Sequence, residues 1–247
     1  MATCDVMDTT DINCGEFMKH MKLDIVRVLY KSQQRKVTVV EVSDIKKECS
    51  NKAIKIIPRV DKSGKTLKHV ADYLNEIKIL QLCDHPYVMS LESAVVVANA
   101  IYICMPLYSR GALDTMRSKL EMDHISRYFP QTACALRYLH RKRIIHGDIK
   151  PANILIDASD NAILSDFDCA KLIAEGEDSV SIWRGTKGYI APEYVLGGHP
   201  VNPFLVIFVL FKLSHHCFFI NVTFISFCTL SRLKSLQNSR CLGLLMP

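Results

Sequence analysis

The ten cysteines of this 247-residue chain include no Cys-x-x-Cys pair. The N-terminal stretch MATCDVMDTTDINCGEF is acidic and lacks the apolar core of a secretory signal peptide. Both absences argue against a disulfide framework and predict reduced thiols in a cytoplasmic or nuclear protein. Only His215, His216 and Cys217 cluster. Because adjacent side chains point apart on a helix or strand, we expect no metal site there.

Acidic residues are absent from the last stretch of the chain, residues 200–247. This stretch contributes +4 to the formal net charge of +6, which leaves +2 for the rest. A nucleic-acid-binding surface would need basic residues gathered on one folded face. We therefore expect no nucleic-acid partner.

The same stretch also lacks a helical or strand period, although seven of the ten phenylalanines lie within 204–227. One interpretation is a membrane span at 204–230. Lys212, His215 and His216 interrupt the apolar run before the ~20 residues that a span needs. We favour the alternative, an apolar tail of foreign coding sequence, such as an intron read through, that follows a truncated domain.

The rest of the chain divides into three parts. Residues 1–22 show no clear period and are interpreted as a flexible lead-in. Residues 23–105 are rich in strands: alternation predicts strands at 36–45 and 52–58 and two short ones within 93–105. Apolar residues at helical spacing predict one amphipathic helix at 69–83, packed on a small antiparallel sheet.

Residues 106–199 change in character toward helix. A helix is predicted at 123–140 with Phe129, Leu136 and Leu139 on its apolar face, and Pro130 should kink it or delay its start. The runs NILID and NAILSDF then predict a β-hairpin that turns at residues 158–160. Asp157 and Asp160 are interpreted as solvated turn residues.

The spacing of several polar residues suits phosphoryl transfer. That chemistry needs a carboxylate to orient a hydroxyl, ligands for a metal ion and a lysine on the phosphates. Asp148, Lys150 and Asn153 fall on one short loop, and Asp166 follows a strand 18 residues after Asp148. A further lysine, Lys55, precedes a glutamate on the predicted helix by 21 residues.

These residues and their surroundings resemble the eukaryotic protein kinase family over residues 25–199. The matching stretches, in chain order, are KAIKI, NEIKIL, CDHPYV, IYICMPLYSRGAL, LHRKRIIHGDIKPANIL, SDFD and RGTKGYIAPE. The pairs Lys150-Pro151 and Gly185-Thr186 are similar to the serine/threonine branch. The resemblance implies an α+β fold of two lobes, a small antiparallel-sheet N-lobe (23–105) and a helical C-lobe (106–199) truncated after Ala-Pro-Glu.

The resemblance also implies a role for each matching residue, with ATP and Mg²⁺ as cofactors and a protein as substrate. Asp148 would orient the substrate hydroxyl and Lys150 would steady the γ-phosphate. Thr186 would brace both, and Phe167 would stack with His146. Metal ligands would be Asn153 and Asp166. ATP contacts would come from Lys55, Glu76 (which holds Lys55), Met105, Leu107 and Tyr108, and the activation segment would carry Ser179 and Ser181 as phosphorylation sites.

Four departures from the family pattern stand out. The nucleotide-covering loop falls at 33–40 and contains no glycine, which should weaken nucleotide binding. Gly147 replaces an arginine that would pair with an activation-loop phosphate, so switching by that ion pair is not expected. Asp168 replaces a glycine and removes conformational freedom from its turn. The helices that the family has after the Ala-Pro-Glu segment, Ala191–Glu193, are missing.

Two functions from different classes follow. The first is a serine/threonine protein kinase that transfers the γ-phosphate of ATP to a protein hydroxyl. The second is a catalytically silent, kinase-like binding module, either a pseudokinase or a truncated splice form. The complete set of catalytic polar residues favours the first, and the missing C-lobe helices favour the second.

Overall fold

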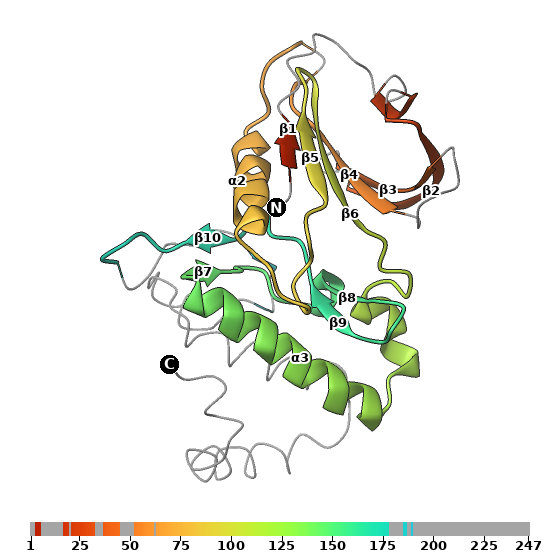
Figure 1. Cartoon of the computed structure of the whole chain (residues 1–247), viewed down its shortest axis with the longest axis vertical. Coiled ribbons are helices and arrows are strands. Elements are labelled where there is room, and N and C mark those ends of the chain that lie inside the picture. The colour runs from red at the N-terminus through yellow and green to blue at the C-terminus, as the bar shows by residue number, and fades with distance from the viewer. Residues whose placement is uncertain are drawn as a thin grey trace. The chain divides into compact units, whose positions relative to one another are not determined.

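The computed structural model describes residues 3–5, 17–19, 21–32, 37–44, 52–61, 63–177, 185, 186 and 189. These residues fall into two compact units. Those within 1–84 and 89–108 form the first, and those within 85–88 and 109–247 form the second. Strands dominate the first unit and helix α3 dominates the second (Figure 1).

A six-stranded sheet in the order β1-β5-β6-β4-β3-β2 forms the first unit. Its strands are β1 (Thr3–Asp5), β2 (Leu23–Lys31), β3 (Thr38–Asp44), β4 (Lys52–Pro58), β5 (Ser93–Val96) and β6 (Ala100–Pro106). All neighbours are antiparallel except β1, which runs parallel to β5. The antiparallel sheet predicted from the alternating pattern is confirmed, and the two edge strands β1 and β2 are additions to the predicted strands.

The two faces of this sheet have different partners because side chains alternate along each strand. On one face, Val40 of β3, Ile54 of β4 and Tyr102 of β6 belong to one buried apolar cluster. On the other face, Lys55 points toward helix α2 (Val70–Gln81) and forms an ion pair with it. Its spacing predicts an apolar side made of Val70, Leu74, Ile77 and Leu82: Val70 and Ile77 are buried, Leu74 is half-buried, and Leu82 is 49% exposed. Tyr73 and Leu80 are buried in addition.

Part of the N-terminal lead-in packs on the sheet. Residues 17–19 form a helical turn, and Phe17 and Met18 are 3% and 4% exposed. The ring of Phe17 stacks on Tyr102, with 3.7 Å between centroids and 10° between planes. The prediction of a flexible lead-in therefore does not hold for these residues, because their apolar side chains belong to the buried cluster of Val40, Ile54 and Tyr102.

Strand β2 forms the other edge of the sheet and exposes several large apolar side chains. These are Ile25, Val26, Val28, Leu29 and Tyr30. Two register shifts interrupt its pairing with β3. Irregular pairing and charged residues are common on edge strands because they discourage pairing with another chain.

The second unit is built on helix α3 (Met122–Arg141). Around it lie the 3₁₀ helices η1 (Leu113–Lys119) and η2 (Pro151–Asn153), the hairpin β8 (Ile154–Ile156) and β9 (Ala162–Leu164), and the pair β7 (Ile144–Ile145) and β10 (Lys171–Leu172). The hairpin lies where the sequence predicts it. The pairing of β7 with β10 is antiparallel and joins residues more than 25 positions apart.

Helix α3 differs from its prediction in two respects. It runs without a break through Pro130, which neither delays its start nor ends it. Proline removes one backbone donor, and the packing of the buried residues Ala135, Leu136 and Leu139 holds the helix together. Phe129 is 40% exposed, whereas its neighbour Tyr128 is 3% exposed and belongs to the core.

No helix in the part of the chain that the structure describes is long and apolar enough to cross a bilayer. Residues 200–247 lie outside the described residues. The two interpretations of this tail, a membrane span at 204–230 and foreign coding sequence, therefore remain predictions.

The first prediction concerns the contact between the lead-in and the sheet. Replacing Phe17 with alanine should lower the free energy of unfolding by about 3 kcal/mol, since it removes a buried ring and leaves Tyr102 without its stacking partner. Urea denaturation followed by fluorescence measures this. Met21→Ala, at a residue 37% exposed, is the control and should change stability by less than about 0.5 kcal/mol. Equal stability of the two variants would contradict the contact.

Candidate active site

A buried ion pair joins strand β4 to helix α2 in the first unit. Lys55 Nζ lies 3.0 Å from Glu76 Oε1 and 2.9 Å from Oε2. Lys55 is 7% exposed and Glu76 is fully buried. The ammonium also lies 4.9 Å from the centre of the Tyr73 ring. A buried ion pair adds little net stability, because both charges lose their hydration. It differs from a surface ion pair in that burial fixes the positions of the two side chains.

The residues predicted to contact ATP in the first unit lie either on the face of the sheet that carries Lys55 or just beyond the end of strand β6. Met105 pairs with Ala53, and Ile103 pairs with Lys55. Residues two positions apart on a strand share a face, so Met105 and Lys55 lie on one face of the sheet. Met105 is buried, whereas Leu107 and Tyr108, just beyond the end of β6, are half-buried.

In the second unit, the carboxylate of Asp148 is held by three donors. Its Oδ1 accepts the backbone N–H of Thr186 at 2.8 Å. Its Oδ2 accepts Lys150 Nζ at 2.5 Å and Asn153 Nδ2 at 3.2 Å. Asp148 is only 7% exposed. Hydrogen bonds to a charged group are stronger than neutral ones, so the orientation of this carboxylate is well determined.

Thr186 contacts both charged residues of the loop. Besides the backbone bond to Asp148, its Oγ1 accepts a hydrogen bond from Lys150 Nζ at 2.7 Å. Thirty-six residues separate Lys150 from Thr186, so only the tertiary structure brings them together. Ser179 and Ser181 lie outside the described residues, as do residues 33–36 of the glycine-free loop.

The hairpin carries the two predicted metal ligands at its base. Asn153 precedes β8, and Asp166 follows β9 by two residues. Ser165 connects the two ends: its N–H and its hydroxyl both donate to the carbonyl of Asn153, at 2.8 and 2.9 Å. Asp166 has a positive φ of 61°, which turns the chain sharply at this point.

The oxygens at the base of the hairpin suit Mg²⁺. The amide nitrogen of Asn153 donates to the backbone carbonyl of Asp148 at 2.7 Å and to its carboxylate, which directs the amide oxygen away from that loop. One amide oxygen and one carboxylate, completed by phosphate and water oxygens, are a typical donor set for this ion. Among the described residues no group of three His, Cys, Asp or Glu side chains gathers for a metal.

A neutral histidine lies behind the loop. His146 is 1% exposed, and its ring lies 4.7 Å from that of the fully buried Phe167. Burial lowers the pKa of His146, so the ring is neutral at pH 7. Its Nδ1 accepts the N–H of Asp148 at 3.3 Å, so Nε2 carries the proton and donates to the carbonyl of Ser165 at 2.9 Å. The ring thereby links the loop to the base of the hairpin.

Gly147 sits between these residues with a φ of +82°. A Cβ at this position would lie 2.7 Å from the carbonyl oxygen of Cys169, which is too close. The replacement of the family's arginine by glycine therefore allows the loop to pack against the backbone after Asp168. The freedom that glycine would give at position 168 is not needed here, because Asp168 has no positive φ and the positive φ of this turn lies at Asp166.

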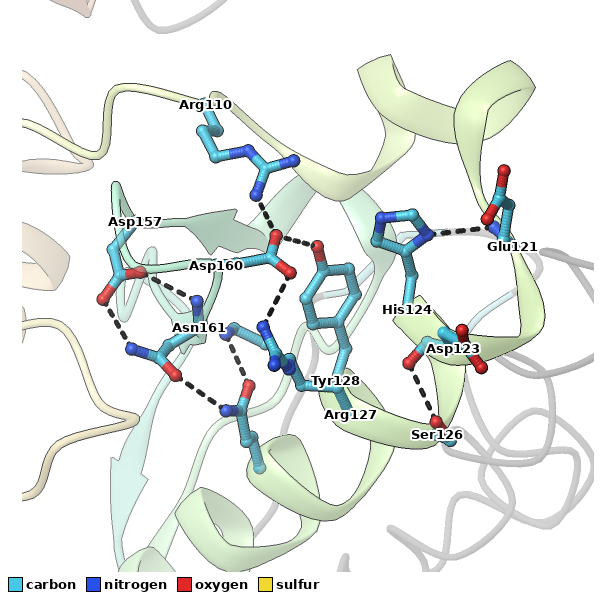
Figure 2. Close-up of polar contacts among 12 residues, drawn as sticks. Arg110, Glu121, Asp123, His124, Ser126, Arg127, Tyr128, Asp157, Asp160 and Asn161 are labelled. Carbon is cyan, nitrogen blue, oxygen red and sulfur yellow. Dashed lines mark hydrogen bonds and ion pairs between the residues drawn. The ribbon is translucent and has the colours of Figure 1, made fainter.

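A polar cluster at the far end of the hairpin was not predicted (Figure 2). Asp160 accepts hydrogen bonds from Arg110, from Arg127 Nη1 at 2.9 Å and from Tyr128 Oη at 2.6 Å. Asp160 lies in the turn and is partly exposed, as interpreted, but its carboxylate also ties the turn to helix α3. The partners lie 32 to 50 residues away in sequence, so no local signal reveals them.

The chain is similar in sequence to known protein kinases. The chain matches the protein kinase domain family over residues 37–208. It is 33% identical over 131 residues to a probable serine/threonine-protein kinase of Dictyostelium discoideum, covering 52% of this chain and 29% of that protein. It is 30% identical over 161 residues to a serine/threonine protein kinase of Oryza sativa subsp. indica, covering 64% and 31%. Serine/threonine-protein kinase 32C of Mus musculus is 29% identical over 198 residues, covering 77% and 38%.

The family match spans more than half of the chain, so the chain belongs to the protein kinase family, as a relative of serine/threonine-protein kinases. The matches cover 29–38% of the length of these three curated relatives. Membership of this family confirms the two-lobed α+β fold class expected from the resemblance.

The second prediction tests the close packing at Gly147. Gly147→Ala should lower the free energy of unfolding by about 1–3 kcal/mol more than Gly176→Ala does. The control residue has nearly the same backbone conformation, with a φ of +84°, but nothing lies within 4 Å of its added Cβ. The difference between the two variants in chemical denaturation therefore isolates the contact with Cys169. No difference would show that the loop can move away from that carbonyl.

The third prediction concerns the cluster at Asp160. The hydrogen bond from Tyr128, together with Arg110 and Arg127, lowers the pKa of this carboxyl. Burial raises the pKa of Tyr128 to about 12, so the phenol remains a donor. Because the pKa is lower in the folded state, the stabilisation is complete above the unfolded pKa, about 4, and is lost as pH falls through the folded pKa.

Asp160→Asn should therefore lower the melting temperature at pH 7, and this loss should shrink as pH falls below about 4. Thermal unfolding of both proteins at pH 7, 5 and 3.5 measures the difference. Asp114→Asn, at an exposed residue of η1, removes the same charge and should have little effect. A loss that stays constant with pH would exclude the charge of Asp160 as its cause.

Proposed function

We propose that the chain is a serine/threonine protein kinase that transfers the γ-phosphate of ATP to a hydroxyl of a protein substrate, with Mg²⁺ as cofactor. The observation that carries this proposal is the arrangement around Asp148. Its carboxylate is oriented by Lys150, Asn153 and the backbone of Thr186. Membership of the protein kinase family and the similarity to serine/threonine-protein kinases support the same activity.

Asp148 would act on the nucleophile in this mechanism. Its carboxylate accepts a hydrogen bond from the substrate hydroxyl and takes the proton as the bond from oxygen to phosphorus forms. The bond between the γ-phosphorus and the bridging oxygen breaks, and ADP is the leaving group. The bonds to Oδ1 and Oδ2 keep the carboxylate in one orientation, which removes the need to reorganise it in the transition state.

Two lysines would neutralise phosphate charge. Lys150 lies on the Asp148 loop, so its ammonium can contact the γ-phosphate while it remains close to the substrate hydroxyl. Lys55 would contact the α- and β-phosphates, and Glu76 holds its ammonium in position. Mg²⁺, bound by Asn153 and Asp166, would supply positive charge to the phosphate oxygens.

The second candidate function is the catalytically silent binding module. The absence of glycine from residues 33–40 favours it, because side chains there restrict the approach of the backbone to phosphates. The complete set of Lys55, Glu76, Asp148, Asn153 and Asp166 favours the enzyme. We therefore retain the kinase as the leading proposal.

The fourth prediction separates the two functions. Purified wild-type chain should incorporate label from γ-labelled ATP in the presence of Mg²⁺, and Asp166→Ala should reduce incorporation by at least about a hundredfold, since it removes a metal ligand. Asp114→Ala, outside the site, is the control and should retain activity. Phosphoamino-acid analysis should find phosphoserine or phosphothreonine.

The fold of each variant is checked by circular dichroism before the assay. A folded wild-type chain that incorporates no label would favour the silent module. Equal labelling of wild type and Asp166→Ala would contradict the role of Asp166 as a metal ligand.

A further inference from the structure

Arg143 occupies a backbone conformation that usually belongs to glycine. It follows Lys142, which is the C-cap residue of helix α3, and it has a φ of +60°. The position after a helix cap is commonly glycine, because a Cβ disfavours the left-handed conformation. Its N–H donates to the carbonyl of His140 at 2.9 Å, which ends the helix. The left-handed conformation is unfavourable for a residue with a Cβ, so other contacts must compensate for its cost. Such contacts point to a structural or functional role for the residue.

The side chain of Arg143 supplies these contacts. Its Nε donates to the carbonyl of Ile173 at 3.4 Å, and its Nη2 donates to the carbonyls of Ala174, at 2.7 Å, and of Glu177. Its backbone carbonyl accepts the N–H of Ile173 at 2.8 Å. One residue thus binds the segment 173–177 through both its main chain and its guanidinium group.

Arginine is suited to this position because its planar group presents several donors in a rigid fork. The three carbonyls it binds belong to a short turn, in which the N–H of Glu177 donates to the carbonyl of Ala174 at 3.1 Å. Carbonyl groups carry no net charge, so this attachment requires no phosphate. Gly147 has no side chain, and its contact with Cys169 leaves no room for one.

Along the chain, the anchored segment lies between two parts of the candidate site, Asp166 and Thr186. It begins shortly after Asp166, and the chain continues from it to Thr186, whose backbone binds Asp148. The strand pair β7 and β10 joins the same region to residues 144 and 145. Holding residues 173–177 shortens the stretch of chain that must be closed to bring Thr186 to Asp148, which lowers the entropic cost of that contact.

We propose that Arg143 is a positioning residue that anchors the start of the activation segment, residues 173–177, through backbone carbonyls and without a phosphate group. The effect on catalysis rests on the proposed kinase function. The anchoring itself is a structural property, and an experiment can measure it in a chain with no activity.

The fifth prediction tests this anchor by hydrogen–deuterium exchange on the full chain. Arg143→Gly removes the guanidinium but suits the positive φ, so the melting temperature should be unchanged or higher. Exchange in peptides that cover 171–177 should nevertheless become about tenfold faster, because bonds from a charged donor are lost. Arg143→Lys should give an intermediate rate, since an ammonium lacks the fork. Arg141→Gln, at an exposed neighbour, should leave the rate unchanged.

Two further measurements distinguish anchoring from general loosening. Low millimolar ethylguanidinium should slow exchange in Arg143→Gly and have no effect on wild type. Treatment of wild type with a phosphatase should not change exchange in 171–177. Exchange in Arg143→Gly equal to that of wild type, or loosening of wild type by phosphatase, would overturn the proposal.

Activity provides a separate readout. If the wild-type chain phosphorylates a protein substrate, Arg143→Gly should raise the KM for that protein several-fold, with little change in the KM for ATP. A wild-type chain without activity, but with faster exchange in Arg143→Gly, would leave the anchor intact and refute only the kinase function.

Discussion

The carboxylate of Asp148 is the point on which the geometry of the second unit depends. It is almost completely buried, and a buried carboxylate is stable only when donors surround it. Those donors come from Lys150, from the amide of Asn153 and from the backbone of Thr186. A single charge therefore brings together the loop, the base of the hairpin and a residue 38 positions further along the chain.

Backbone conformation is the second constraint, and it determines which residues can occupy three positions. At Gly147 a Cβ would lie 2.7 Å from the carbonyl oxygen of Cys169, which is too close for a side chain. Asp166 and Arg143 both have a positive φ, although neither is glycine. In Arg143 the guanidinium makes contacts that a glycine could not make. The departure at Gly147 thus packs against Cys169, the residue that follows the departure at Asp168.

Much of the fold could be predicted because the signals are local. The alternation of KAIKIIP defines strand β4 at the residues where the structure has it, and the helical spacing around Glu76 defines α2. The order of the motifs indicated the family and its candidate catalytic residues. Tyr128 was missed because periodicity alone cannot distinguish two adjacent aromatic residues, and helix α3 tolerates Pro130 because its packing outweighs one lost hydrogen bond.

The sequence alone predicts strands β3, β4, β5 and β6, the hairpin of β8 and β9, helices α2 and α3, and the spacing of the polar residues suited to phosphoryl transfer. Three contacts become visible only in the folded chain: Phe17 stacks on Tyr102, Asp160 binds helix α3, and Arg143 holds residues 173–177. The physical reason is the same in each case. These contacts join residues 30 or more positions apart, and such contacts depend on how elements pack, which short-range periodicity does not encode.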